Sequence, residues 1–202
     1  MIVADMTNAS GPHLILASTS PRRRELLAQA GFRFIVRARP VDEVRAPKED
    51  PRDYVTRLAQ AKAEAARDSL DEIVLGADTT VVLDHHVLEK PAHPAAAKAM
   101  LRALSCREHT VLTGICLLHP GGKIVDCETT RVSMVELSEE EIDAYVATGE
   151  PMDKAGAYGI QGLASKFVDR VDGCFFNVMG LPVALVYKHW RAVTKAPTRP
   201  RL

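Results

Sequence analysis

The stretch HLILASTSPRRRELLAQAG, residues 13–31, decides how this chain begins to fold. Its apolar run at 13–17 predicts a short buried strand, because such runs between turn signals are typical of strands in a sheet core. Ser20 is an N-cap residue type, Pro21 fits the first helical position, and Gly31 suits the C-terminal cap. The stretch therefore predicts a strand, a tight loop and then a helix between these caps.

Arg22, Arg23 and Arg24 place positive charge in the first turn of this expected helix. A helix N-terminus already carries about +0.5 charge and several free backbone N–H groups, so cations are unfavourable there unless an anion is bound. Strand, loop and helix N-terminus form a common phosphate cradle, and arginine donates bidentate hydrogen bonds to phosphate oxygens. The alternative is an arginine run that simply extends into solvent. The preceding strand and the clean capping favour an anion site.

The composition limits the classes of partner that this chain binds. Its 202 residues fit one domain, or one domain with two lobes, and 47% of them are hydrophobic and 26% charged. Lysine plus arginine and aspartate plus glutamate number 26 each, so no overall basic field points to a nucleic acid polymer or to an acidic membrane. Any anion site must therefore be local.

The ends of the chain and its cysteines predict a cytoplasmic protein. Residues 1–12 lack a basic segment followed by an apolar one, so we expect a disordered extension there rather than a signal peptide. The sequence contains no run of about 18 apolar residues, so it predicts no membrane span. The four cysteines form no C-x-x-C pair and no zinc spacing, as expected of reduced thiols. We expect one folded domain over residues 13–192 and a flexible tail over residues 193–202.

The order of the expected elements predicts an α/β fold with a mixed sheet. Helices and strands alternate along most of the chain. Two longer strands at 109–118 and 123–137 are joined by a turn at 120–122, and this hairpin interrupts the alternation. We therefore expect a mixed sheet rather than a purely parallel, doubly wound one. The glycine-rich loop at 156–162 matches neither the Rossmann nor the P-loop pattern.

Asp78 breaks the apolar pattern at the end of the run 73–77, where an unpaired charge would be costly. Ligand sites in open α/β sheets gather at the carboxyl ends of strands, and Asp78 is expected at such an end. The alternative is an Asx-turn or a cap for the residues that follow. Because strand-forming residues follow it instead of a helix, the pattern favours a functional role.

Two lysines also lie at unexpected positions. Lys62 lies on the apolar face of a helix expected over 50–68, together with Val55. Its amine either reaches water beside that face or points into a cleft as a partner for phosphate. Lys90 lies between a strand and a helix, which alone carries little information because exposed lysines are common. Cations neutralise a polyphosphate and carboxylates hold Mg²⁺ or activate water, so the whole set predicts phosphoryl or nucleotidyl hydrolysis.

A series of short motifs follows the chain from its first strand to its last helix. They are ASTSPRR (17–23), VDE (41–43), QAKA (60–63), GADT (76–79), KP (90–91), HTVLTG (109–114), DKAGAYGIQG (153–162) and NVMGLP (177–182). In this order they resemble the Maf family of nucleoside triphosphate pyrophosphatases, whose signature is A-S-x-S-P-R-R. The resemblance covers residues 13–190.

The resemblance implies both a fold and an activity. The fold is an α/β, ITPase-like one, with an elongated mixed sheet flanked by helices and two lobes around a central cleft. The activity is an attack of water at the α-phosphate that depends on a divalent cation, Mg²⁺ or Mn²⁺, and releases a nucleoside monophosphate and pyrophosphate. The loop Y-G-I-Q-G resembles the branch that acts on dTTP and UTP rather than the branch that acts on 7-methyl-GTP.

The resemblance also implies roles for individual residues. Ser18, Arg22 and Arg23 would bind the triphosphate, with Lys62 and Lys90 assisting in catalysis. Glu43 and Asp78 would be the metal ligand and the general base, in an order that stays open. Thr79 and Gln161 would contact the substrate, and the Gln161 amide can both accept from a pyrimidine N3–H and donate to a ring carbonyl. Arg24 falls outside the signature and is expected in solvent.

Two departures from the family pattern concern the shape of the cleft. Glu89 stands where a small residue is expected, and residues 173–176 are less polar than usual. Two alternatives also stay open. One is the same fold acting on 7-methyl-GTP or on other nucleotides, and the other is a nucleotide-binding regulator of septum formation. A homodimer is left open as well.

Overall fold

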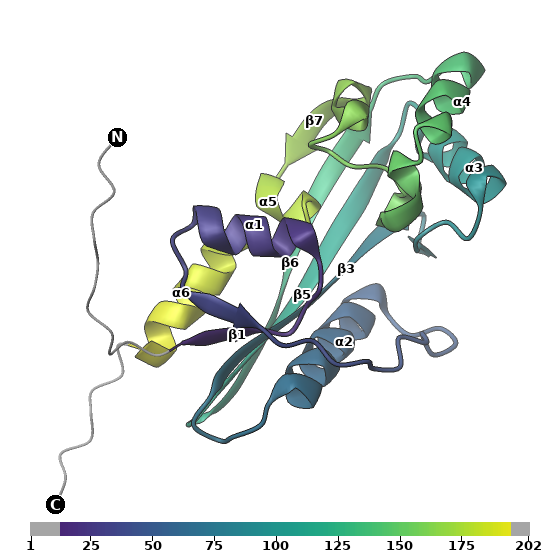
Figure 1. Cartoon of the computed structure of the whole chain (residues 1–202). Coiled ribbons are helices and arrows are strands. Elements are labelled where there is room, and N and C mark those ends of the chain that lie inside the picture. The colour runs from purple at the N-terminus through teal and green to yellow at the C-terminus, as the bar shows by residue number, and fades with distance from the viewer. Residues whose placement is uncertain (1–12, 195–202) are drawn as a thin grey trace, which may run out of the picture.

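The computed structural model describes residues 13–194, and these residues form one mixed seven-stranded sheet with helices on both faces (Figure 1). The strand order is β2-β1-β3-β5-β6-β7, and β4 pairs with the far part of β3. The terminal segments 1–12 and 195–202 lie outside the described residues. Residues 193 and 194, expected in the tail, belong to the last helix.

The elements agree with the expected alternation, with one short helix added before the last one. The strands are β1 (Leu14–Leu16), β2 (Phe34–Val36), β3 (Ile73–Leu83), β4 (His86–Leu88), β5 (Glu108–His119), β6 (Gly122–Met134) and β7 (Val168–Asp172). The helices are α1 (Pro21–Gln29), α2 (Pro51–Ala66), α3 (Pro94–Leu104), α4 (Glu139–Ala147), α5 (Phe175–Val178) and α6 (Val183–Thr194). Three 3₁₀ turns, η1 (Glu150–Asp153), η2 (Ala155–Ala157) and η3 (Leu163–Phe167), follow α4.

The sheet is mixed, as predicted, because parallel and antiparallel pairs meet at β3. Strand β1 pairs in parallel with β2 and with the start of β3, where Leu16 lies opposite Leu75. All later pairs, including the predicted β5–β6 hairpin, are antiparallel. The chain leaves the sheet after β1, so beyond Leu75 the edge of β3 on that side has no partner strand until β4 pairs with it from Val81.

One prediction about Asp78 is wrong, since Asp78 lies in the middle of β3 and not at its end. The strand continues because β5 pairs with it from Val74 to Val82, and Gly114 of β5 lies opposite Asp78. Asp78 nevertheless lies just past the part of β3 that β1 covers. It is therefore at the carboxyl end of the parallel part of the sheet, where ligand sites of open α/β sheets gather.

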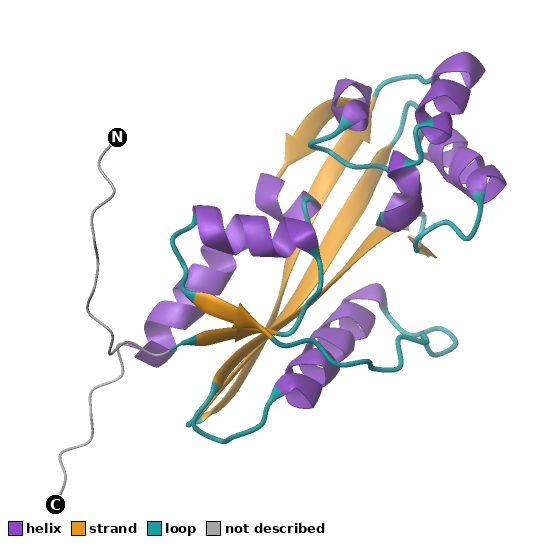
Figure 2. Cartoon of the chain, viewed as in Figure 1, coloured by secondary structure: helices purple, strands orange, loops and turns teal. Residues whose placement is uncertain are grey.

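The two faces of the sheet carry different helices (Figure 2). On one face α2 packs alone over β1, β3 and β5 through small apolar residues such as Ala59 and Ala63. On the other face α1, α3, α4 and α6 share a single larger core with the same strands. Two glycines let α2 approach closely: a Cβ on Gly76 would lie 2.0 Å from Ala59 O, and one on Gly114 would lie 2.4 Å from Val55 O.

The long strands β3, β5 and β6 extend through both ends of the molecule and give it the elongated shape that was predicted (Figure 1). One end holds β1, β2, α1, α2 and α6, and the other holds β7, α3, α4 and the 3₁₀ turns. Among residues 13–194, no helix combines the length and the hydrophobicity needed to cross a membrane.

Candidate active site

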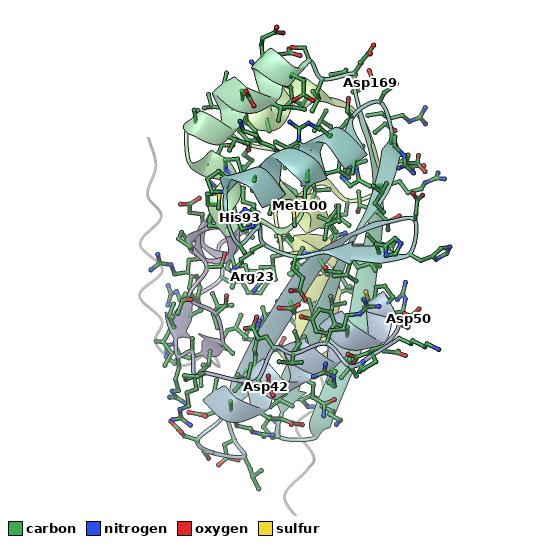
Figure 3. All side chains as sticks on the ribbon, turned by 90° about the vertical axis from the view of Figure 1, so that its right-hand side faces the viewer. Arg23, Asp42, Asp50, His93, Met100 and Asp169 are labelled. Atoms are coloured by element: carbon green, nitrogen blue, oxygen red, sulfur yellow. The ribbon has the colours of Figure 1, made fainter. Side chains whose placement is uncertain are left out.

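A cleft of about 900 Å³ opens where the two ends of the molecule meet, along the free edge of β3. Figure 3 looks onto this side and shows Arg23 between the end that carries Met100 and the end that carries Asp42. Every site residue expected from the sequence lines this cleft: Ser18, Arg22, Arg23, Glu43, Lys62, Asp78, Thr79, Lys90 and Gln161. The fold therefore brings the complete predicted set together.

The first turn of α1 forms the basic wall of the cleft, and its capping is as predicted. The Ser20 side chain accepts from the backbone N–H of Arg23, Pro21 occupies the start of the helix, and the first turn contains no acidic residue. Arg22 is half-buried, whereas Arg24 is exposed, as expected. The positive end of a helix and the Arg22 side chain thus face the same cleft.

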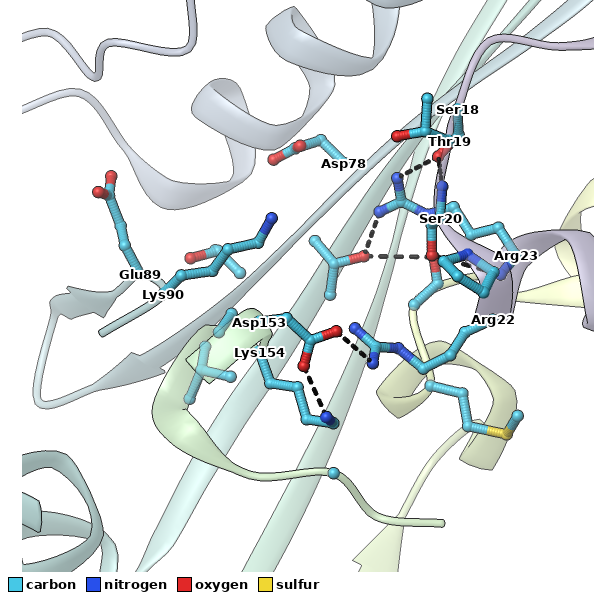
Figure 4. Close-up of a pocket in the computed structure, with 18 of the residues that line it drawn as sticks. Ser18, Thr19, Ser20, Arg22, Arg23, Asp78, Glu89, Lys90, Asp153 and Lys154 are labelled. Atoms are coloured by element: carbon cyan, nitrogen blue, oxygen red, sulfur yellow. Dashed lines mark hydrogen bonds and ion pairs between the residues drawn. The ribbon is translucent and has the colours of Figure 1, made fainter. Parts of the chain in front are cut away.

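The guanidinium of Arg23 is held mainly by protein acceptors, and its expected contact with a triphosphate stays a prediction (Figure 4). It donates to Gly180 O (2.8 Å), Ala77 O (2.9 Å), Thr79 Oγ1 (3.0 Å) and Ser18 Oγ (3.2 Å). These bonds use four of the five N–H groups of an arginine. Ala77 O lies on the β3 edge that β1 leaves uncovered, so Arg23 satisfies a carbonyl that a strand would otherwise satisfy.

Burial of the Arg23 guanidinium among these acceptors also changes its pKa. Desolvation lowers the pKa of its guanidinium below the ordinary value, and the nearby Asp78 carboxylate opposes that shift. An arginine stays cationic under these conditions. Arg23 therefore adds a fixed positive charge to the floor of the cleft while it joins α1 to the edge of the sheet.

An ion-paired group that the sequence did not assign closes one side of the basic wall. Arg22 Nη1 lies 3.2 Å from Asp153 Oδ2, and Lys154 Nζ lies 2.7 Å from Asp153 Oδ1 and 2.6 Å from Glu150 O (Figure 4). Burial raises the pKa of Asp153, but Lys154 and Arg22 together hold it below its ordinary value. In the described structure the cation of Arg22 thus contacts a carboxylate, as it would contact a phosphate oxygen.

The opposite wall carries two carboxylates that share one ammonium group. Lys62 Nζ lies 2.6 Å from Asp78 Oδ1 and 2.9 Å from Glu43 Oε1. Lys62 therefore points into the cleft, and the alternative in which it reaches water beside the helix is excluded. Asp78 is only 8% exposed, and its ion pair with Lys62 offsets the cost of that burial. The Glu43 side chain is 57% exposed.

Tyr54 and Glu89 complete this acidic wall. Tyr54 Oη lies 2.8 Å from Glu43 O and 3.4 Å from Glu89 Oε1. Burial, followed by the Glu89 and Asp78 charges, raises the pKa of Tyr54 to about 12, so its hydroxyl remains a donor. Glu89 thus adds a third acidic residue to this wall of the cleft, next to the exposed Lys90. Its unusual position was visible in the sequence, but its partner Tyr54 was not.

The glycine-rich loop wraps around Glu150. A Cβ on Gly162 would lie 2.2 Å from Glu150 Oε1, and one on Gly159 would lie 2.6 Å from Lys154 Cε. The loop carries Gln161, which is exposed toward the cleft. These glycines are therefore required by close packing, and the fold presents Gln161 in the same cleft as the paired carboxylates.

The buried pair of His109 and Tyr158 packs beneath the glycine-rich loop and connects it to the sheet. Tyr158 Oη lies 2.7 Å from His109 Nε2, and the two rings meet edge to face. His109 is 2% exposed, and its Nδ1 has no hydrogen-bond partner among residues 13–194. Burial lowers the pKa of His109 to about 4, so the ring is neutral near pH 7. The pair joins β5 to the loop that presents Gln161.

The residues present fit a divalent cation that is shared with a nucleotide. Within residues 13–194 no group of three or more Asp, Glu, His or Cys side chains forms a complete cage for a metal ion. Mg²⁺ is commonly bound by one or two carboxylates, with water and substrate phosphates completing its shell. Asp78 and Glu43 supply such a pair, and Lys62 already contacts both with a positive group.

The protein has an α/β fold, and its cleft carries cations on one wall and paired carboxylates on the other. Such a lining suits a polyphosphate ligand. A family model described as Maf-like protein matches residues 13–193. This chain therefore belongs to the Maf family, as the resemblance predicted.

Several relatives and one solved structure are similar over nearly the whole chain. A Koribacter versatilis protein named dTTP/UTP pyrophosphatase is 54% identical over 90% of this chain and 94% of its own length. Proteins of the same name from a Geobacillus species and from Vibrio cholerae are 51% and 50% identical, over 85% and 84% of this chain and 92% of each relative. The Staphylococcus aureus Ham1 structure has a TM-score of 0.52 at 14% identity, covering 89% of this chain and 98% of its own, which shows the fold alone.

Proposed function

We propose that this chain hydrolyses dTTP and UTP at the α-phosphate and releases the nucleoside monophosphate and pyrophosphate. The observation that carries the proposal is the cleft itself, in which the first turn of α1 faces a carboxylate pair bridged by Lys62 and Lys90 adds a further cation to the lining. The names of relatives about half identical to the chain support the same activity. Such opposed charges suit a reaction in which negative charge builds up on a leaving pyrophosphate.

The basic wall binds the triphosphate. Arg22 exchanges the carboxylate of Asp153 for phosphate oxygens, while free N–H groups at the start of α1 add donors. Lys90 approaches the phosphates from the opposite side of the cleft. Arg23, with Ser18 and Thr79, fixes the position of this wall and adds a positive charge behind it.

The acidic wall handles the attacking water. We assign the general base to Asp78, because its carboxylate is held on a central strand and is shielded from solvent. Glu43 and Asp78 would hold Mg²⁺ or Mn²⁺, which when bound neutralises phosphate charge and assists departure of pyrophosphate. Lys62 contacts both carboxylates and orients them until the substrate enters.

The loop that carries Gln161 selects the base. An amide side chain can accept from the N3–H of thymine or uracil and donate to a ring carbonyl. Close packing of Gly159 and Gly162 around Glu150 and Lys154 fixes where that amide is presented.

The cellular setting is part of the proposal. We place the reaction in the cytoplasm, because all four cysteines are free thiols, as is usual for proteins of a reducing compartment. A homodimer remains a prediction.

The test measures pyrophosphate released from dTTP, UTP, CTP, GTP and 7-methyl-GTP, with and without Mg²⁺ or Mn²⁺. We expect cation-dependent turnover with a preference for dTTP and UTP. A preference for 7-methyl-GTP would overturn the choice of base. Binding of dTTP without any turnover would instead favour a nucleotide-sensing regulator.

A further inference from the structure

Glu43 needs a support that Asp78 and Lys62 do not need. Asp78 lies on β3 and Lys62 lies on α2, so regular elements fix their backbones. Residues 37–50, which carry Glu43, form neither helix nor strand. The side chain of Glu43 is also 57% exposed, yet its carboxylate lies 2.9 Å from Lys62 Nζ. Some contact must hold this segment against α2.

The hydroxyl of Tyr54 supplies such a contact at Glu43 itself, while Arg57 of α2 holds the residues that follow through Val44 O at 3.1 Å and the Glu49 carboxylate at 2.7 Å. Tyr54 lies in the first turn of α2 and is 5% exposed, with its ring packed among Val55, Leu58 and Leu112. Its Oη donates to the backbone carbonyl of Glu43 at 2.8 Å. The donor belongs to a rigid, buried ring, whereas the acceptor belongs to an irregular segment. The bond therefore fixes the segment and not the ring.

Further contacts of Tyr54 and Arg57 join the segment around Glu43 to α2 and to Glu89. Tyr54 Oη lies 3.4 Å from Glu89 Oε1, directly before Lys90 in the chain. The Arg57 guanidinium lies over the Tyr54 ring and donates to Val44 O at 3.1 Å, next to Glu43. A phenol has one proton to donate, and the shorter distance assigns it to Glu43 O.

We propose that Tyr54 is a positioning residue that fixes Glu43 beside Lys62 and thereby sets the affinity of the cleft for a divalent cation. The proposal rests on the function proposed above, with Glu43 as one of the two carboxylates that hold the ion. Tyr54 acts through the Glu43 backbone and touches neither substrate nor cation.

The variant Tyr54→Phe isolates the hydroxyl, because the ring and its packing remain. Loss of a hydrogen bond of ordinary strength weakens an equilibrium by a factor of about two to ten. We therefore expect Mn²⁺ to bind about five times more weakly, and the Mn²⁺ concentration for half-maximal turnover of dTTP to rise by the same factor. The turnover rate at saturating Mn²⁺ should fall by a smaller factor than the affinity for Mn²⁺.

The test combines calorimetric titration of Mn²⁺ into protein that holds a non-hydrolysable dTTP analogue with initial rates over a range of Mn²⁺. Tyr187→Phe is the matched control, because it removes the hydroxyl of an exposed tyrosine on α6, away from the cleft. Glu43→Gln and the double variant Tyr54→Phe/Glu43→Gln show whether the two residues act together. Thermal unfolding of each variant reports on folding.

The expected result is a loss of Mn²⁺ affinity in Tyr54→Phe, none in Tyr187→Phe, and no further loss when Tyr54→Phe is added to Glu43→Gln. Unchanged affinity in Tyr54→Phe, or an equal loss in the Glu43→Gln background, would overturn the proposal. Because calorimetry needs no turnover, wild-type protein that binds Mn²⁺ and the analogue but leaves dTTP intact would overturn only the proposed function.

Discussion

Three consecutive arginines have three different environments in this protein. Arg22 pairs with Asp153 across the cleft, Arg23 is held by backbone and hydroxyl acceptors, and Arg24 extends into solvent. The sequence was sufficient to predict the cationic first turn of α1, and the family resemblance separated Arg24 from its neighbours. It could not separate Arg22 from Arg23, because Ala77 O and Gly180 O, which hold Arg23, belong to distant parts of the chain.

The Arg22→Ala variant tests the basic wall at the level of one residue. Loss of a charge-assisted contact to phosphate should raise KM for dTTP by at least about tenfold, since such bonds contribute about 1.5–3 kcal/mol. Steady-state kinetics of pyrophosphate release measures the change. Arg24→Ala is the matched control, and equal effects in the two variants would contradict the separation of their roles.

Asp78→Asn tests the acidic wall. The side chain keeps its size but can no longer accept a proton, so turnover should fall by about 10²- to 10⁴-fold, the contribution typical of a general base. Pyrophosphate release measures the rate, and circular dichroism with thermal unfolding confirms that the variant folds. Full activity in a folded variant would remove Asp78 from the mechanism.

Among the elements, β3 and α2 determine where the site can form. The apolar run, the strand formers after Asp78 and the lysine on a helical face were enough to predict both elements and to direct attention to Asp78 and Lys62. Only the family resemblance assigned a role to Glu43, and no role was assigned to Tyr54 or Asp153. These three depend on irregular segments or on single hydroxyl and ion-pair contacts, for which local sequence carries no periodic signal.

Gly76→Ala tests the close packing between these two elements. The added Cβ would lie 2.0 Å from Ala59 O and 2.8 Å from Ala63 N, so α2 has to move. We expect the free energy of unfolding to fall by about 1–3 kcal/mol. We also expect lower activity, because Lys62 moves with the helix. Urea unfolding measures the first effect.

Gly121→Ala is the control for this substitution. It lies in the β5–β6 turn, outside the left-handed backbone region, and its Cβ would meet nothing closer than 3.2 Å. A Gly76→Ala protein as stable and active as Gly121→Ala would show that α2 does not need this close approach.

For the molecule as a whole, the buried His109 makes stability depend on pH. Burial lowers its pKa to about 4 in the folded state, against an ordinary value of 6.5. Above pH 6.5 both states are neutral at this site, and the stability is fully present. As the pH falls toward 4 the unfolded chain takes up a proton that the folded protein does not, so the unfolding free energy should fall by about 3 kcal/mol.

Urea unfolding of the wild type and of His109→Gln at pH 7.5 and 4.5 measures this contribution. The variant is expected to be less stable at pH 7.5, because it disturbs a buried pair, but to lose less stability on acidification than the wild type. Equal acid sensitivity in the two proteins would contradict a buried, neutral His109.

The central claim concerns the whole cleft: water attacks the α-phosphate of dTTP. Hydrolysis in ¹⁸O-labelled water, followed by mass spectrometry of both products, tests it most directly. We expect one ¹⁸O atom in the phosphate of dTMP and none in pyrophosphate. Label in pyrophosphate, or release of orthophosphate with dTDP, would contradict the arrangement of basic and acidic walls proposed for this site.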